Sequence, residues 1–365
     1  MPMSAWIVPP FDDWSSSMNW TVPLALAVSV VSTAVGQEPV ARAGAGRPAA
    51  ADSLAPVVDS AERATLIEQV AAALERGYVF PDTARLIIQA LRERFRRGEY
   101  DRLVDPTALA DSLTAHLRAV SHDEHLRVRV RGGGAGPMRA PGNPGISANG
   151  PGGVGEVRRL DGNIGYLLLN GFPDVSRMGP ALAAAMEQLA STDALLIDLR
   201  RNGGGSPASV MQLAGYFFDR PTLMARFYSR PDDVTTEQWS AEVSGPKYGG
   251  KPLYMLTSNR TFSAAEAAAY HLQAFGRAVV VGETTRGGAH PSRRADLTLR
   301  FDMVVPGART MSIPTGTDWE RVGVVPNIAV SAERALVAAQ LAALRSLPRT
   351  AERDRVIAEL ERGGA

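Results

Sequence analysis

The sequence predicts an α/β fold in which a helical region precedes a layered domain with a largely parallel sheet. Two observations carry this prediction. Apolar residues recur at helical spacing between residues 63 and 121, and after residue 157 short apolar runs alternate with helical patterns. Such alternation is typical of a domain whose helices pack on the faces of a parallel sheet. At about 150 residues per domain, a chain of 365 residues is long enough for two domains.

The N-terminal region predicts a targeting segment. Residues 21–36 form an uncharged, mostly apolar run of 16 residues, which is short for a membrane span of about 20 residues and fits the core of a signal peptide. We expect a signal peptide over 1–36, with Met18 as the possible true start, and a linker over 37–57. The mature protein is then exported to the periplasm or the extracellular space, without an integral membrane domain. Because no basic residue precedes the run, a hydrophobic tail is the alternative.

The helical region is expected to hold three helices within residues 58–130. The first covers 63–76, with Leu66, Val70 and Leu74 on one face. Pro81 and Pro106 open the second and third helices, since proline is well tolerated at a first helical position. Residues 131–156, dense in glycine and proline, are predicted to be a linker.

The layered domain is predicted over 157–335, followed by a C-terminal helix over 336–365. The expected strands are 163–170, 194–200, 253–257 and 278–282, with a late β-rich segment at 296–305. The expected helices between them are 178–189, 207–218 and 264–275.

Composition excludes several classes of chemistry. The 39 basic and 38 acidic residues leave a net charge near +1, which gives no reason to expect nucleic-acid binding. Only Lys247 and Lys251 are lysines, so most lysine-based mechanisms lack their residue. Cysteine is absent, which removes thiol nucleophiles and cysteine-based metal sites.

Ser263 is the best candidate nucleophile. It lies between the end of a predicted strand and the start of a predicted helix, where backbone amides can stabilise a developing oxyanion. Ser263 and Glu266 also have the spacing of a capping box, a purely structural role. The two roles are compatible.

A glycine-rich segment over 198–206 is a second candidate. Gly203, Gly204 and Gly205 follow a strand and precede a helix, so their amides could bind an anion. Neither common phosphate-binding pattern is present, and a plain turn is an equal alternative.

Candidate bases are few, because the chain has five histidines. His122 and His125 flank Asp123 and Glu124, but this spacing is weak evidence for a metal, and no metal site is predicted. A general base is the better role for one of them. His290 is a reserve candidate. His116 is expected at the surface, and His271 is expected to be either packed or solvated on its helix.

Together these segments resemble the tail-specific (C-terminal processing) serine peptidases, and more closely the branch that contains the tricorn core protease and interphotoreceptor retinoid-binding protein. The similarity covers roughly residues 61–330. Its motifs are YVFP at 78–81, DEHLRV at 123–128, GYL at 165–167, DLR at 198–200, NGGG at 202–205, TFSAAE at 261–266, GETT at 282–285, and Glu320 with GVVPN at 323–327.

The resemblance implies a Clp protease/crotonase-like α/β domain preceded by a small three-helix domain. It also implies that Ser263 is the acylated nucleophile, that His125 is the general base, and that Glu320 orients the imidazole. The oxyanion hole would combine the amides of Ala264 and Gly204.

Four departures from the family pattern are visible. Gly288 stands where the processing-peptidase branch has its catalytic lysine, so a Ser–Lys dyad is excluded. Glu124 stands where the tricorn branch has a second serine, and Asn327 replaces the usual aspartate of the closing motif. The segment between the helical region and the sheet leaves no room for a PDZ domain.

The predicted function is that of an exported serine-type peptidase with a Ser-His-Glu triad, acting on peptides or unfolded protein segments without a cofactor. Two alternatives are a non-catalytic binder of apolar ligands on the same fold and a hydrolase of small esters.

Overall fold

The computed structural model describes residues 57–131 and 151–363. The predicted signal peptide, nearly all of the first linker and most of the glycine/proline-rich segment therefore lie outside the described residues. Within the described ranges, no helix combines the length and the apolar character that a membrane crossing needs.

Three helices form the N-terminal part of the described chain: α1 (Ser60–Gly77), α2 (Pro81–Arg96) and α3 (Pro106–Ser121). Asp59 and Asp105 cap α1 and α3, each accepting a backbone N–H of the first turn at 2.7 Å. Proline occupies the start of α2 and α3, as predicted.

A small antiparallel sheet covers the apolar side of these helices. Its strands are β1 (Arg127–Val130), β10 (Phe301–Pro306) and β9 (Ser292–Asp296), in the order β1-β10-β9. Phe301 and Met303 of β10 are fully buried in one cluster with helix residues such as Leu66. Two of the three strands thus come from residues 292–306, far along the chain from the helices that they cover.

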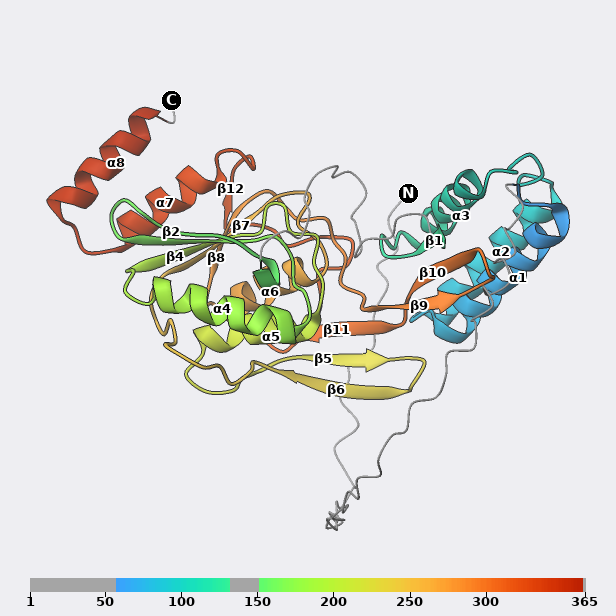
Figure 1. Cartoon of the computed structure of the whole chain (residues 1–365), viewed down its shortest axis with the longest axis horizontal. Helices are drawn as coiled ribbons and strands as arrows, with labels where there is room; N and C mark the ends of the chain where they lie inside the picture. The colour runs from blue at the N-terminus through green and yellow to red at the C-terminus, as the bar shows by residue number, and fades with distance from the viewer. Residues whose placement is uncertain (1–56, 132–150, 364–365) are drawn as a thin grey trace, which may run out of the picture. The chain divides into compact units, whose positions relative to one another are not determined.

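The main sheet has six strands in the order β12-β8-β7-β4-β3-β2 (Figure 1). All neighbouring pairs are parallel except β2 and β3, which are antiparallel. The strand bounds are β2 (Val154–Leu160), β3 (Ile164–Leu169), β4 (Ala194–Asp198), β7 (Leu253–Thr257), β8 (Val279–Gly282) and β12 (Ile328–Ala329). The strands predicted from the apolar runs are present in β3, β4, β7 and β8.

Helices cover both faces of the main sheet, and side-chain alternation along the strands explains why. Leu195 and Ile197 of β4 belong to the apolar cluster that includes α4 (Val175–Leu189), α5 (Pro207–Ala214) and α6 (Ala264–Ala274). Ala194 and Leu196 belong to the opposite cluster, with α7 (Ala335–Ser346) and α8 (Ala351–Gly363). Figure 1 shows α4 and α5 on one side of the sheet and α7 on the other.

The C-terminal segment differs from the prediction of a single helix. It forms two helices, α7 and α8, separated after Ser346. Leu347 is extended, as expected of a residue before proline, and Pro348 cannot donate the backbone hydrogen bond that would continue α7.

Three further strands, like β1, β2 and β12, were not predicted from the sequence. β5 (Leu223–Ser229), β6 (Val234–Trp239) and β11 (Ala308–Ser312) form an antiparallel sheet in the order β11-β5-β6. β6 is mostly exposed and its four central residues are polar, so it has no apolar run that would have marked it. Two short 3₁₀ turns, η1 (Pro151–Gly153) and η2 (Gly215–Phe217), complete the described elements.

The packing of β10 on the helices yields a stability prediction. Replacing the fully buried Phe301 with alanine should lower the free energy of unfolding by about 3–5 kcal/mol, because the substitution leaves a cavity in this cluster. Leu299→Ala is the control, since Leu299 is 83% exposed and its loss should cost at most about 0.5 kcal/mol. Urea denaturation measures both, and equal effects would contradict the packing described.

Candidate active site

The candidate site lies at the carboxyl edge of the parallel strands. Because β4, β7 and β8 run in the same direction, the loops that follow them meet at one edge of the sheet, the usual place for a site in such sheets. The glycine segment follows β4, the turn that ends in Ser263 follows β7, and the loop with Gly288 and His290 follows β8.

Ser263 sits at the N-terminus of α6 in a strained backbone conformation. Its φ of 55° and ψ of −121° are rare for a residue with a side chain. The fully buried Glu266 helps to hold this turn, because its carboxylate accepts the Ser263 N–H at 2.7 Å. The same carboxylate accepts the N–H groups of Gly287 and Gly288, which ties the β8 loop to the serine turn.

The charge state of Glu266 depends on two opposing effects. Burial raises the pKa of Glu266 to about 7, while the hydrogen bonds from Thr285, Gly287, Gly288 and Ser263 work against that rise. Ser263 and Glu266 form the predicted capping box, and the bond from the Ser263 N–H to the Glu266 carboxylate also holds the serine turn in place.

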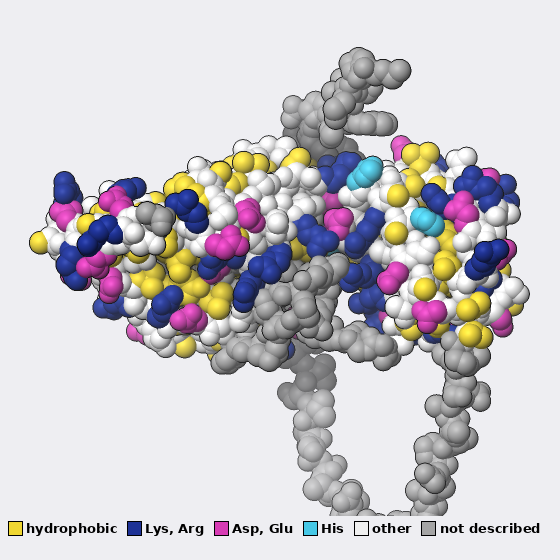
Figure 2. Space-filling model, turned by 90° about the horizontal axis from the view of Figure 1, so that it is seen from above, with side chains coloured by type: hydrophobic (Ala, Val, Ile, Leu, Met, Phe, Trp, Pro, Cys, Tyr) yellow, Lys and Arg dark blue, Asp and Glu magenta, His cyan; other side chains and the backbone are white. Residues whose placement is uncertain are grey.

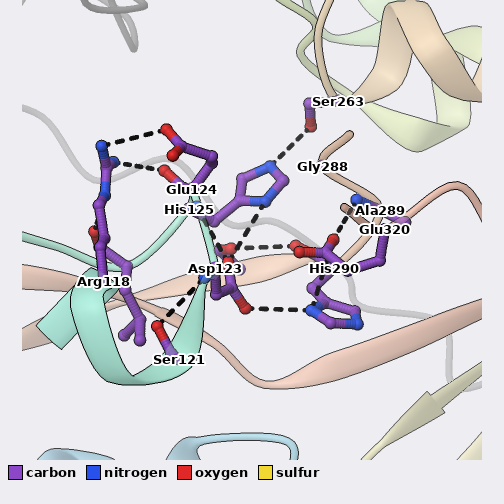
Figure 3. A network of polar contacts seen from close by, with 12 residues as sticks. Arg118, Ser121, Asp123, Glu124, His125, Ser263, Gly288, Ala289, His290 and Glu320 are labelled. Atoms are coloured by element: carbon purple, nitrogen blue, oxygen red, sulfur yellow. Dashed lines mark hydrogen bonds and ion pairs between the residues drawn. The ribbon is translucent and has the colours of Figure 1, made fainter. Parts of the chain in front are cut away.

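His125 faces Ser263 across the site. Its Nε2 lies 3.1 Å from the Ser263 Oγ, although 138 positions separate the two residues in the sequence (Figure 3). The His125 ring packs on Phe262 with 4.5 Å between ring centroids, and the residue is only 6% exposed. Burial lowers the pKa of His125 to about 4, against the opposing charge of Asp123, so the imidazole is neutral at physiological pH and can accept a proton.

No hydrogen bond or ion pair joins Glu320 to His125. Its Oε2 accepts the Ala289 N–H at 2.6 Å and lies 3.5 Å from the His290 Nδ1. The carboxylate nearest to the His125 Nδ1 belongs to Asp123, with its Oδ1 at 3.9 Å, beyond hydrogen-bond distance. Within the described chain the buried His125 Nδ1 has no hydrogen-bond partner, and neither has the Glu320 Oε1.

Asp123, His290 and Glu320 form a buried ionisable cluster behind His125 (Figure 3). The His290 Nδ1 lies 3.0 Å from the Asp123 Oδ2, while the Asp123 Oδ1 accepts the backbone N–H of His125 at 3.0 Å. The Tyr78 hydroxyl donates to the same Asp123 Oδ2 at 3.3 Å.

Pairing with His290 determines the charges in this cluster. Burial alone would lower the pKa of His290, but the hydrogen bond to Asp123 and the charge of Glu320 outweigh it and raise the pKa. Burial alone would raise the pKa of Asp123, and the contacts with His290 and His125 lower it instead. Burial raises the pKa of Glu320 to about 7. These directions fit a protonated His290 paired with the Asp123 carboxylate, while Glu320 ionises only as the pH rises through about 7.

The cluster is also where a metal ion could bind. The ligand atoms of Asp123, His290 and Glu320 lie within 4.8 Å of one another, which makes them the one candidate group in the described ranges. Because the His290 Nδ1 already pairs with Asp123, a proton explains the arrangement without an ion. The absence of a catalytic metal therefore stays a prediction.

The predicted oxyanion donors lie beside the serine. Gly204 has a φ of +99°, and a side chain there would come within 2.8 Å of the Ser263 Cβ, so only glycine fits this close approach. The Gly204 N–H, however, donates to the Asn202 Oδ1 at 2.9 Å. Among the described residues, the N–H groups of Ala264 and Gly205 have no acceptor, and both residues line the cavity next to Ser263.

Sequence reasoning gave the remaining histidines smaller roles. His271 is fully buried and bonds to the Ser312 Oγ at 3.1 Å, so of the two expected placements, packed or solvated, the structure shows the packed one. His116 is partly buried and bonds to the Tyr100 hydroxyl at 2.9 Å, rather than lying free at the surface. His290 had only one signal in the sequence, its place just after the Gly287-Gly288 turn.

Gly288 explains how the site differs from one that uses lysine. A Cβ at position 288 would lie 2.7 Å from the His125 Cε1 and 2.2 Å from the ring of Phe262. Any side chain at this position would therefore displace the His125 ring or Phe262. His125 can occupy its place only because residue 288 has no side chain.

Gly288→Ala should consequently slow the reaction of Ser263 with a fluorophosphonate probe by about tenfold or more, because a misplaced base costs rate steeply. Gly250→Ala is the matched control, since nothing lies within 4 Å of the position of its Cβ. Equal labelling rates in the two variants would contradict the proximity of Gly288 to a working His125.

Two family models match the chain. One is described as peptidase family S41 and matches residues 163–330, and the other is the N-terminal domain of this family in eukaryotic interphotoreceptor retinoid-binding protein and matches residues 58–147.

Two relatives found by sequence similarity agree with these family matches. A carboxyl-terminal-processing protease of Picosynechococcus is 29% identical over 170 residues, which cover 47% of this chain and 40% of the relative. Carboxyl-terminal-processing peptidase 2, chloroplastic, of Arabidopsis thaliana is 30% identical over 166 residues, which cover 45% of this chain and 31% of the relative. The matches thus span less than half the length of these two relatives.

The fold is shared with solved structures. A lipoprotein from Streptococcus agalactiae superimposes with a TM-score of 0.55 at 13% identity, covering 81% of this chain and 100% of the other. The resemblance seen in the motifs is confirmed: the chain is similar to the S41 peptidases over residues 163–330 and to the N-terminal domain of that family over residues 58–147, and its named relatives are carboxyl-terminal processing proteases.

Proposed function

We propose that the protein is a serine-type peptidase in which Ser263 is the nucleophile and His125 the general base. The observation that carries the proposal is the 3.1 Å contact between the Ser263 Oγ and the His125 Nε2, in a site where burial keeps the imidazole neutral. A nucleophile within hydrogen-bond reach of a neutral base is the arrangement that acyl transfer requires.

The chemistry follows from this geometry. The Ser263 Oγ attacks the carbonyl carbon of the scissile bond while the His125 Nε2 takes the hydroxyl proton. The tetrahedral oxyanion accepts the Ala264 N–H and a second amide from the glycine loop, Gly204 as predicted or the unengaged Gly205. His125 then protonates the leaving amine, and a water molecule hydrolyses the acyl-enzyme by the same steps.

We assign the acidic part of the triad to the buried cluster as a whole. Asp123 is nearer to the imidazole of His125 than Glu320 is, and it fixes the loop by accepting the His125 backbone N–H. Glu320 acts at a distance, because it stabilises the charge of His290, which in turn holds the Asp123 carboxylate. In this arrangement Glu320 and His290 are positioning residues. The Ser-His-Glu triad predicted from the family pattern is replaced by a longer series of interacting side chains, in which Asp123 and His290 stand between His125 and Glu320.

The remaining parts of the proposal concern fold type, substrate and location. A largely parallel sheet with helices on both faces and a site at its carboxyl edge supports the Clp protease/crotonase-like assignment. The names of the relatives support peptides or unfolded protein segments as substrates. Export rests on the apolar run over 21–36. The mechanism uses this chain's own residues and needs no cofactor.

Hydrolysis of an unstructured protein such as casein tests the proposal. The purified protein should cleave it, and Ser263→Ala and His125→Ala should each lower kcat/KM by about a thousandfold or more. Thermal unfolding should show that both variants remain folded. A folded wild-type protein that cleaves no peptide but binds apolar ligands would favour the non-catalytic alternative, and cleavage of small esters alone would favour the third function.

Two carboxylate variants distinguish the roles of Asp123 and Glu320. Asp123→Asn should lower kcat about a hundredfold or more, while Glu320→Gln should lower it less, about tenfold, because its carboxylate acts through His290. Glu320 has a pKa of about 7 and becomes negative above it, so the wild-type rate should gain a step near pH 7 that Glu320→Gln lacks. A larger loss with Glu320→Gln than with Asp123→Asn would contradict the assignment.

The depressed pKa of His125 predicts the acid limb of the rate profile. Protonated imidazole cannot take the serine proton, so the rate falls as the pH drops through the pKa of His125. Since burial brings this pKa to about 4, the lowest inflection of kcat/KM should lie well below the ordinary imidazole value of about 6.5. An inactive enzyme at pH 5.5 that recovers with a single inflection above 6.5 would contradict the burial of the base.

A further inference from the structure

A cavity of about 300 Å³ adjoins the candidate catalytic residues. Ser263, His125, Ala264 and Gly205 all contribute to its lining, so a substrate whose carbonyl reaches the serine must occupy it. The chemistry of the remaining lining therefore bears on which peptides the site accepts.

The charged side chains that line the cavity are all arginines. Arg129, Arg293 and Arg294 contribute to the lining, and no aspartate or glutamate does. Basic side chains gather in the middle of the face that Figure 2 views.

Strand alternation explains why Arg129 and Arg294 face this space. In the antiparallel sheet β1-β10-β9, Arg129 pairs with Asp302 and Arg294 pairs with Val304, so these four residues share one face of the sheet. The opposite face carries Phe301 and its neighbours, which pack on the helices. The sheet thus has an apolar face toward the helices and a polar face toward the cavity.

The arginines exceed their partners in charge. Arg129 and Arg294 both pair with the one carboxylate of Asp302, at 2.7 and 2.6 Å, and Asp302 is only 3% exposed. Asp296 lies 3.7 Å from the Arg294 Nε but also pairs with Arg131. The two carboxylates, of Asp302 and Asp296, therefore pair with three guanidinium groups, those of Arg129, Arg294 and Arg131. One positive charge beside the cavity is left without a carboxylate of its own.

Arg293 adds no net charge, since it pairs with the exposed Asp232. The side chain of Arg294 is the one best placed to engage a ligand, because it is 55% exposed whereas that of Arg129 is 26% exposed. If Arg294 turned from Asp302 toward a ligand, the Asp302 carboxylate would still be paired with Arg129.

The rest of the lining is largely apolar. Trp319, Phe227 and Ala267 contribute to it, and Trp319 is held in place by the bond of its Nε1–H to the Gly288 carbonyl at 2.9 Å. A ligand that fills the cavity would therefore combine an apolar side chain with a negative group.

We propose that this cavity is a specificity subsite that selects peptides bearing a carboxylate close to the scissile bond, with Arg294 as the residue that recognises it. The proposal rests on the proposed peptidase function. The carboxylate comes either from an aspartate or glutamate side chain or from the C-terminus of the peptide, and both present the same chemistry to a guanidinium group.

Three peptides of otherwise identical sequence test it. One carries an internal glutamate and an amidated C-terminus, the second carries glutamine and an amidated C-terminus, and the third carries glutamine and a free C-terminus. The wild-type protein should cleave at least one of the carboxylate-bearing peptides about tenfold better in kcat/KM than the neutral one, as expected for a hydrogen bond to a charged group. Preference for the first or the third peptide identifies the source of the carboxylate.

Arg294→Gln should reduce that kcat/KM ratio to near one. Arg97→Gln is the matched control, because the side chain of Arg97 is 57% exposed and ion-paired with Glu99 at 2.9 Å on the helical region. The control should keep the full preference, and 0.5 M salt should weaken it in the wild-type protein. A wild-type protein that cleaves all three peptides equally, or an Arg294→Gln variant that keeps the preference, would overturn the proposal.

A binding measurement separates this proposal from the peptidase function. Fluorescence anisotropy with the Ser263→Ala protein and labelled versions of the same peptides reports recognition without turnover. Tighter binding of a carboxylate-bearing peptide, lost with Arg294→Gln in the same background, supports the subsite even if no cleavage is found. Equal binding of all three peptides would contradict the proposed subsite even if the protein cleaves casein.

Discussion

The pairing of β1, β10 and β9 is the constraint on which the site depends. His125 lies two residues before the start of β1 and His290 two residues before the start of β9, and both strands pair with β10. The register of this small sheet therefore sets where the base and the buried cluster stand. Phe301 and Met303 anchor β10 in the helical core. The apolar packing of the helices therefore helps to fix the position of His125 relative to Ser263.

Burial keeps His125 uncharged, whereas Asp123 and His290 behind its ring are buried together as charged partners. It removes the imidazole from water and keeps it neutral, which suits a base. Behind the ring, Asp123, His290 and Glu320 are buried together, and a shared proton on His290 lets two carboxylates stay close without a large cost in charge repulsion. The buried carboxylate of Glu266 has a separate role, because it accepts four hydrogen bonds that shape the serine turn and the loop carrying Gly288.

Much of this arrangement could be predicted from the sequence, for identifiable reasons. The strand that ends at Thr257 and the helix that begins at Ala264 are local patterns, so the position of Ser263 followed from them. The scarcity of lysine, together with Gly288, pointed to a histidine base, and the structure shows why a side chain at 288 and His125 exclude each other. The choice of His125 itself came from the family motif.

What could not be predicted depends on pairings between distant residues. β9 and β10 lie in the predicted catalytic segment, yet they complete the sheet on the helices, and no local pattern reveals that partner. The contact between Asp123 and His290 spans 167 positions, so the sequence offered Glu320 as the acid and His290 only as a reserve. The amide of Gly204 was predicted as a donor, but its bond to Asn202 depends on a turn geometry that composition does not determine.

The central claim is that His125 activates Ser263. Labelling of the purified protein with a fluorophosphonate probe, followed by peptide mapping, tests it most directly. The account predicts one label per chain on Ser263 and loss of labelling in a folded His125→Ala variant. A folded wild-type protein that takes no label, or a His125→Ala variant that is labelled as fast as the wild type, would contradict it.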